Sequence, residues 1–121
     1  MKKATRPREK VYINYITVDT QEDGRFYSFF GIDEYSKFAF LLSTTIELSE
    51  GAILLAVMDL MKHKDFVTEP QEPFTIVCNM GQEIEDKLAF IVAQQNGKIS
   101  FDKKAVHNNT NHFIQQFKQR L

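Results

Sequence analysis

The chain is poor in the features that define several large classes of protein. Its single cysteine, Cys78, cannot form an internal disulfide, so no oxidised framework holds the chain together. Its five glycines build no glycine-rich phosphate-binding loop, and its His and Cys residues lack the spacing of a zinc site. No apolar run reaches the roughly 18 residues of a membrane span, so we expect no membrane partner.

What is present fits one folded domain. The 121 residues are 43% hydrophobic and include 11 phenylalanines, which is enough to bury a real core. The first ten residues, MKKATRPREK, are basic and are not followed by the apolar stretch of a signal peptide. We therefore expect a basic tail or linker over residues 1–10, one domain over residues 11–121, and a cytoplasmic location.

Charge is distributed unevenly along the chain, although the net charge is only −1. Residues 1–10 hold five Lys or Arg against one Glu, and residues 98–121 hold five against one Asp. Residues 11–97 hold five against 14 Asp or Glu, which makes the middle strongly acidic. A DNA-binding protein presents a basic face, and only the two ends of this chain can supply one. Solvated tails on an acidic body explain the same pattern.

The first third of the chain predicts three strands joined by short turns. Residues 11–20, VYINYITVDT, and residues 25–33, RFYSFFGID, are rich in β-branched and aromatic side chains, and the QEDG between them has turn chemistry. A third strand over residues 37–44 follows the tight EYS connection. Two short turns in succession predict an antiparallel meander.

The rest of the chain alternates helices and strands. Apolar residues at helical spacing predict a helix over residues 48–63, capped near Ser49, and a second helix that begins after Gly81. The apolar face of a final helix is formed by Phe113, Ile114, Phe117 and Leu121. A short apolar run predicts a buried strand over residues 74–79, and NGKISF at residues 96–101 predicts a turn and a short strand. Residues 102–111 are predicted as a loop. The order predicts an α/β protein with a mixed five-stranded sheet, made of an antiparallel meander plus two added strands, and with helices on its faces.

Four segments, in this order, resemble the catalytic core of integrases and transposases. They are ITVDT at residues 16–20, GIDEYSKFAFLLS at residues 31–43, IVCNMGQEI at residues 76–84 and HNNTNHFIQQF at residues 107–117. The resemblance covers residues 11–121 and implies a ribonuclease-H-like fold, whose element order is the one predicted above. It also implies a domain shortened at its C-terminus, because such cores continue with further helix.

The resemblance places three site residues, Asp19, Asn79 and Gln115, with 35 residues between the last two. At these positions the family has two Asp and a Glu, which hold two Mg²⁺ or Mn²⁺ ions around a phosphoryl transfer. Asp19 is the remaining acid and hence the expected metal ligand. The two amides keep the shape of a carboxylate but lose the negative charge that Mg²⁺ prefers. The resemblance thus implies a domain related to DNA integration with impaired catalysis.

Three functions remain open on the sequence. The favoured one is a degenerate integrase-type domain, without cofactor, whose remaining role is DNA contact through its basic ends, homodimerisation, or neither. The second is an active Mg²⁺- or Mn²⁺-dependent strand transferase, in which Glu83 is the best substitute metal ligand. The third is a non-enzymatic α/β interaction module, in which the 35-residue spacing is a coincidence. None of the three uses a small-molecule substrate.

Other polar residues have simpler expected roles. Asp33 is expected to begin the turn into the third strand, and His107 and His112 to lie in a solvated polar loop. Glu83 also suits the first turn of a helix, where its charge complements the helix dipole. Cys78 is expected to be a buried, apolar side chain without the partners of a catalytic thiol.

Overall fold

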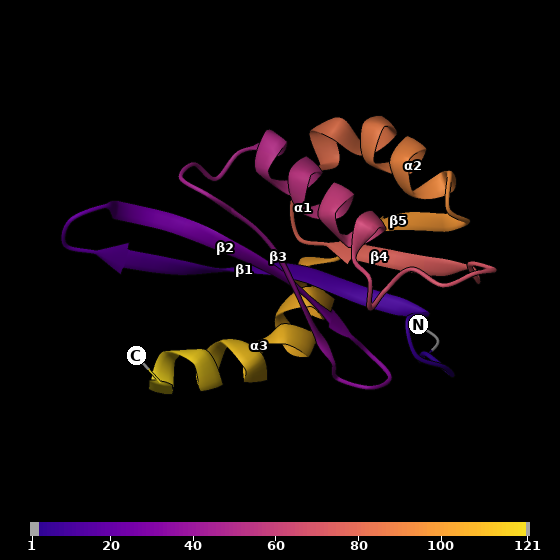
Figure 1. The fold of residues 1–121 in the computed structure, drawn as a ribbon, viewed down its shortest axis with the longest axis horizontal. Coiled ribbons are helices and arrows are strands. Elements are labelled where there is room, and N and C mark those ends of the chain that lie inside the picture. The colour runs from indigo at the N-terminus through magenta and orange to yellow at the C-terminus, as the bar shows by residue number, and fades with distance from the viewer. Residues whose placement is uncertain (1–2, 121) are drawn as a thin grey trace.

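Five strands form one mixed sheet in the order β3-β2-β1-β4-β5 (Figure 1). The computed structural model describes residues 3–120, with side chains as far as Lys118. The strands are β1 (Lys10–Thr20), β2 (Gly24–Asp33), β3 (Ala39–Thr45), β4 (Phe74–Cys78) and β5 (Gly97–Phe101). β1, β2 and β3 are antiparallel neighbours, and β4 and β5 continue the sheet in parallel with β1. The predicted α/β class and the mixed five-stranded sheet are confirmed.

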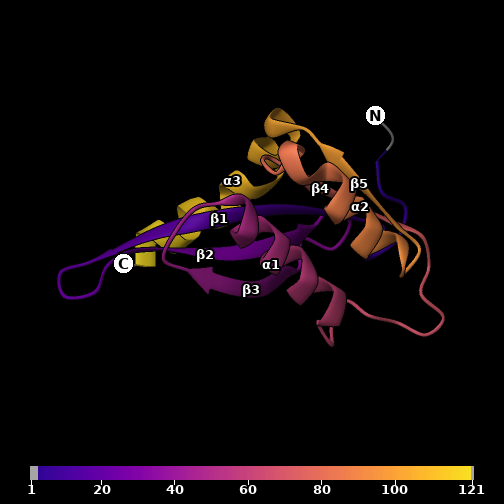
Figure 2. The same cartoon turned by 90° about the horizontal axis from the view of Figure 1, so that it is seen from above.

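Helices cover both faces of this sheet. They are α1 (Glu50–Lys62), α2 (Glu85–Ala93) and α3 (Lys103–Arg120), and a 3-10 turn, η1 (Gln82–Ile84), precedes α2. Figures 1 and 2 show α1 and α2 on one face and α3 on the other. The two faces follow from the alternation of side chains along β1. Val11 and Ile13 join the core under α1 and α2, whereas Tyr12 packs with Val106 of α3.

The start of α1 is set by a local capping interaction. Ser49 is the N-cap residue, and its hydroxyl accepts a hydrogen bond of 3.3 Å from the backbone N–H of Ala52. Glu50 lies in the first turn, where a negative charge complements the helix dipole. Leu60, which is fully buried, extends the apolar face of the helix into the core. The predicted helix and its start are confirmed.

α3 begins far earlier than the sequence predicts, so the prediction of a loop over residues 102–111 is wrong. The side chain of Asp102 accepts a hydrogen bond of 3.0 Å from the N–H of Ala105 and caps the helix. Val106 and Thr110 are fully buried, and they extend the apolar face formed by Phe113. Packing on the sheet therefore outweighs the weak helix propensity of the Asn residues in this segment. Leu121, expected on the same face, lies outside the described residues.

The N-terminal segment lies against the domain rather than away from it. Arg6 pairs with Glu72 at 2.9 Å and also donates to the carbonyl oxygen of Pro73. The backbone N–H of Ala4 donates to the Glu34 carboxylate. Residues 3–9, expected as part of a basic tail or linker, are thus tied to two loops of the domain, while residues 1–2 lie outside the described part.

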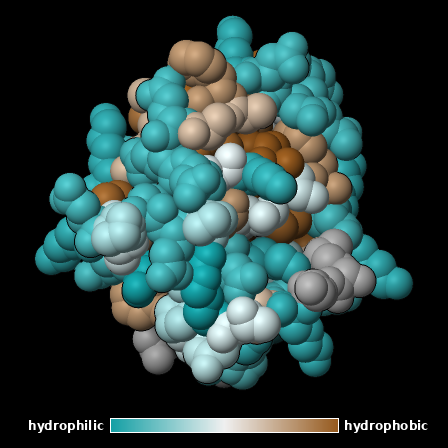
Figure 3. All heavy atoms as spheres, turned by 90° about the vertical axis from the view of Figure 1, so that its right-hand side faces the viewer, coloured by the Kyte–Doolittle hydropathy of each residue, from teal (hydrophilic) through white to brown (hydrophobic). Residues whose placement is uncertain are grey.

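The surface is mostly hydrophilic on the face seen in Figure 3, where hydrophobic atoms gather mainly in the upper half of the view. Within residues 3–120, no helix is both long enough and apolar enough to cross a membrane.

Candidate functional site

A chain of hydrogen-bonded side chains links β4, β1 and α3. Asn79, the first residue after β4, donates from Nδ2 to Oδ1 of Asn14 on β1 at 3.1 Å. Nδ2 of Asn14 in turn donates to Oγ1 of Thr110 on α3 at 2.9 Å. The Thr110 hydroxyl donates to the carbonyl oxygen of Val106 at 2.7 Å. Three segments that are distant in sequence are thus held together by polar contacts at one place.

The strand register brings the two asparagines together. β1 and β4 run parallel, and the last paired residues are Ile13 and Cys78. Asn14 and Asn79 are the next residue on each strand, so they meet where β4 ends. The carboxyl ends of adjacent parallel strands are where open α/β sheets usually bind ligands.

An open pocket of about 450 Å³ lies beside this contact. Asn14 and Asn79 line it together with Met80, which follows β4, and Lys103 and His107 from the first turns of α3. Lys103 and His107 are exposed. The pocket therefore combines two neutral amides with two basic side chains of α3, beside apolar and aromatic side chains.

Asp19 is not brought to this site. It lies five residues beyond Asn14 on the same strand, a separation of about 16 Å in an extended chain. Its Oδ1 accepts a hydrogen bond of 2.7 Å from Nε of Arg25, and this ion pair raises the pKa of Arg25. The β1–β2 hairpin carries Asp19 away from β4 (Figures 1 and 2). The residue of β1 beside Asn79 is Asn14, and Asp19 lies apart from both.

Gln115 lies on α3 but points away from the sheet. Phe113, which packs against Phe30 with ring centroids 4.5 Å apart, belongs to the side of α3 that faces the sheet. Gln115 is exposed, five residues beyond Thr110, which is the α3 residue that contacts Asn14. Asp19, Asn79 and Gln115 are therefore not assembled as one site by this structure.

Among the remaining residues that the sequence singled out, His107 lines the pocket beside Asn14 and Asn79. Glu83 is exposed in η1, and none of the hydrogen bonds of Asn14 or Asn79 described above involves it. His107 and His112 lie on α3, not in a loop, and Nε2 of His112 is 3.0 Å from Nε2 of Gln116.

Two structural predictions are confirmed. Asp33 starts the β2–β3 turn, where its carboxylate accepts hydrogen bonds from the N–H and hydroxyl of Ser36. Cys78 is fully buried, and burial raises the pKa of its thiol to about 12. At that pKa the thiol stays protonated near neutral pH, so it is not activated as a nucleophile.

The oxygens at the asparagine contact do not suit a pair of Mg²⁺ ions. Oδ1 of Asn14 already accepts from Asn79 and from the backbone N–H of Tyr15, the latter at 2.8 Å. The third member, Thr110, offers a neutral hydroxyl, whereas Mg²⁺ prefers anionic oxygen. In the described part of the chain, no group of three or more His, Cys, Asp or Glu side chains could hold a metal ion. The arrangement is a neutral hydrogen-bonded cluster.

Sequence reasoning missed Asn14 and Thr110. Asn14 is a polar residue inside an otherwise largely apolar strand, VYINYITV, and that interruption is the signal that could have identified it. Thr110 lies in a segment rich in asparagine, where its burial becomes evident only once the helix packs on the sheet.

In comparisons with known proteins, no family model matches the chain and no curated protein matches it.

Proposed function

We propose that this chain is a catalytically impaired core domain of the integrase and transposase type. The observation that carries the proposal is the contact between Asn14 and Asn79, two amides side by side on adjacent parallel strands. The sheet order, with three antiparallel strands followed by two parallel ones, agrees with the resemblance in the sequence. The proposed first site position is now Asn14, because it lies beside Asn79 and Asp19 does not.

The chemistry of the cluster explains why activity would be lost. Carboxylates on adjacent strands repel each other and are held in place by the divalent ions between them. Amides remove that repulsion, and here each amide satisfies part of the hydrogen-bonding capacity of its neighbour. The site would thus keep its position in the fold while it loses the charge that binds metal.

DNA contact is assigned to α3 rather than to the N-terminal segment. Residues 103–118 of α3 contain no Asp or Glu, and Lys103, Lys104 and Lys118 are exposed. At the other end of the chain, the charge of Arg6 is offset by Glu72. Backbone phosphates would be neutralised by the lysines of α3, in a contact that does not depend on base sequence. A homodimer stays a prediction, which sedimentation equilibrium would check.

Restoring the acids tests the proposed site. In an Asn14→Asp/Asn79→Asp variant, the two carboxylates repel each other, so the metal-free protein should melt at a lower temperature than the original. Mn²⁺ or Mg²⁺ should raise the melting temperature of the variant, and calorimetry should detect metal binding to it. The original protein should show neither effect.

A matched control carries the same charge change elsewhere. Asn108→Asp/Gln116→Glu places two acids at positions of α3 that are both exposed. In this control, Mn²⁺ or Mg²⁺ should cause no comparable rise in the melting temperature. If it responds as strongly as the restored variant, or if the restored variant binds no metal, the position proposed for the metal site is wrong.

The DNA contact has its own test, a titration of a labelled duplex at several salt concentrations. Affinity should fall steeply with salt, and each lysine of α3 changed to Gln should reduce the salt slope by about one if it neutralises one phosphate. Lys64→Gln, an exposed lysine of the loop after α1, is the control and should leave the slope unchanged. Binding that is absent or insensitive to salt would remove DNA contact from the proposal.

A further inference from the structure

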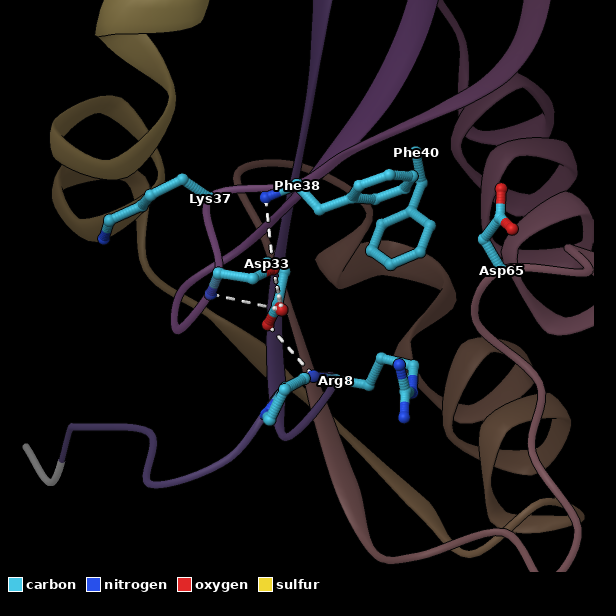
Figure 4. A pocket seen from close by; sticks show the side chains of 8 residues that line it. Arg8, Asp33, Lys37, Phe38, Phe40 and Asp65 are labelled. Atoms are coloured by element: carbon cyan, nitrogen blue, oxygen red, sulfur yellow. Dashed lines mark hydrogen bonds between the residues drawn. The ribbon is translucent and has the colours of Figure 1, made fainter.

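A second pocket, unrelated to the asparagine cluster, lies between the N-terminal segment, the β2–β3 turn and the loop after α1 (Figure 4). Its volume of about 500 Å³ is within the range of small-molecule sites. The residues that matter for its chemistry are Arg8, Asp33, Lys37, Phe38, Phe40 and Asp65. They come from three separate segments, so the pocket exists only in the folded chain.

A buried carboxylate holds the pocket together. Asp33 is only 1% exposed, and its Oδ1 accepts a hydrogen bond of 3.1 Å from the backbone N–H of Arg8. Its Oδ2 accepts from the hydroxyl of Ser36, and its backbone carbonyl accepts from the N–H of Lys37. One side chain thus fixes the N-terminal segment to the turn between β2 and β3.

The backbone of Arg8 is held in an unusual conformation by this contact. Arg8 has a φ of 64° and Lys37 a φ of 65°, both in the left-handed region that most side chains avoid. Lys37 belongs to a hairpin turn, where one left-handed residue is common. Arg8 lies outside any hairpin, and such residues persist where surrounding contacts fix them, often at ligand sites.

The guanidinium of Arg8 differs from those of Arg6 and Arg25 in having no partner among the residues that the structure describes. Arg6 pairs with Glu72 at 2.9 Å and Arg25 pairs with Asp19 at 2.7 Å, but within residues 3–120 no hydrogen bond or ion pair involves the Arg8 side chain. Figure 4 shows the Arg8 side chain among the residues that line the pocket.

Lys37 does not share this role, because it extends away from the pocket and its Nζ donates to the carbonyl oxygen of Glu34 at 2.8 Å (Figure 4). Arg8 is therefore the cation available to a ligand.

Two phenylalanine rings form the apolar wall. Phe38 is 47% exposed and Phe40 is 2% exposed, and their ring centroids are 4.9 Å apart with an interplanar angle of 66°. A half-exposed ring beside a buried one can receive a third ring in an edge-to-face or offset arrangement. Asp65 lines the pocket as well, and its Oδ2 lies 3.9 Å from Nδ1 of His63.

From this geometry we infer that the pocket binds a small aromatic molecule with one anionic group. The guanidinium of Arg8 takes the carboxylate or phosphate of the ligand in two parallel hydrogen bonds. The aromatic ring of the ligand packs against Phe38 and Phe40. This ligand site does not depend on the proposed integrase-type function.

The test is a titration followed by two-dimensional NMR of the ¹⁵N-labelled protein. Benzoate and phenyl phosphate are the two probes, and they distinguish a carboxylate ligand from a phosphate ligand. At least one should bind saturably and shift the amide signals of Arg8 and of residues 33–40. Acetate and inorganic phosphate lack the ring, and benzamide lacks the charge, so each should bind at least about tenfold more weakly.

Two variants and one control locate the binding. Arg8→Asn removes the guanidinium while keeping a residue that tolerates the left-handed conformation, and it should weaken binding about tenfold with an unchanged melting temperature. Phe38→Ala should weaken binding as well, whereas Arg25→Asn, remote from the pocket, should not. The inference is overturned if neither aromatic anion binds saturably, if Arg8→Asn binds equally well, or if acetate or benzamide binds as tightly as the aromatic anions.

Discussion

Nδ2 of Asn79 lies 3.1 Å from Oδ1 of Asn14, and this hydrogen bond joins residues that are 65 positions apart in the chain. It is possible because β1 and β4 are parallel neighbours whose pairing ends one residue earlier. The same Asn14 side chain also donates to the buried Thr110. Removal of the Asn14 amide therefore affects β1, β4 and α3 together.

The first prediction concerns this cluster. Asn14→Ala removes a partner from both Asn79 and Thr110, so it should lower the free energy of unfolding by about 1–3 kcal/mol. Asn79→Ala should cost less, because only one hydrogen bond is lost. A double-mutant cycle measured by urea denaturation should give a coupling of about 0.5–1.5 kcal/mol. A coupling near zero would mean that the two amides do not interact in solution.

The second prediction separates Asp19 from the site. Both side chains of the Asp19–Arg25 pair are more than half exposed, at 66% and 59%. Exposed ion pairs contribute little, so Asp19→Asn should change the free energy of unfolding by less than about 0.5 kcal/mol. It should also leave the Mn²⁺ response of the Asn14→Asp/Asn79→Asp variant unchanged. If Asp19→Asn abolished the Mn²⁺ response, Asp19 would belong to the metal site.

The third prediction compares one substitution at two glycines. A Cβ added at Gly97 would lie 2.3 Å from the Phe74 ring, so Gly97→Ala should destabilise the fold by about 1–3 kcal/mol. Gly51 lies in α1, and the nearest atom to an added Cβ is the Ser49 hydroxyl oxygen at 3.7 Å. Gly51→Ala should stabilise the protein by about 0.5–1 kcal/mol. Thermal unfolding measures the change in stability of both variants. If Gly97→Ala stabilised the protein as Gly51→Ala does, the close packing at Gly97 would be contradicted.

The fourth prediction is a pH dependence from Tyr12 and Glu34. Burial alone would raise the pKa of Glu34, but hydrogen bonds from the Tyr12 hydroxyl and the Ala4 N–H outweigh it and the pKa is lowered. Burial and the hydrogen bond to Glu34 raise the pKa of Tyr12. The Glu34 contribution to stability is therefore present above its ordinary pKa of 4.5 and is lost as pH falls through the lowered value. The Tyr12 contribution to stability is present below its ordinary pKa of 10.0. It is lost as pH rises through the raised pKa of Tyr12.

Urea denaturation from neutral pH to below 4.5 measures the acid side of this dependence. Glu34→Gln should flatten the loss of stability in acid, and Tyr12→Phe should reduce it, because the hydroxyl that lowers the pKa of Glu34 is gone. Glu22→Gln, an exposed carboxyl in the β1–β2 turn, is the control and should keep the acid dependence of the original protein. If Glu34→Gln loses as much stability in acid as the original protein, the Glu34 carboxyl does not contribute to the acid dependence.

The fifth prediction concerns the reactivity of Cys78. Burial raises the pKa of its thiol to about 12, and the residue is fully buried. A thiol reagent at slightly alkaline pH should therefore modify Cys78 only as the protein unfolds, and much faster in concentrated urea. The rate of colour release by an aromatic disulfide reagent measures this. Rapid modification of the folded protein would show that Cys78 is accessible.

Much of the fold could be predicted because its signals are local. The β-branched and aromatic runs of β1 and β2 and the cap at Ser49 depend on residues close in sequence, and the structure bears out these two strands and the cap. The first nine residues of α3 could not be predicted in this way. Their asparagines favour turns, and the helix is stabilised there by the burial of Val106 and Thr110 against the sheet.

For the candidate site, too, local signals in the sequence predicted one part and the tertiary structure decided the other. By itself the sequence determined that a buried strand leads into Asn79 and that helices alternate with strands after the meander, since both follow from hydrophobic pattern and turn chemistry. Only the tertiary structure decided which residue of β1 lies beside Asn79. That choice depends on the register of parallel strands, in which a slip of a few residues moves a side chain by many ångströms. The register selects Asn14 and leaves Asp19 in the hairpin, paired with Arg25.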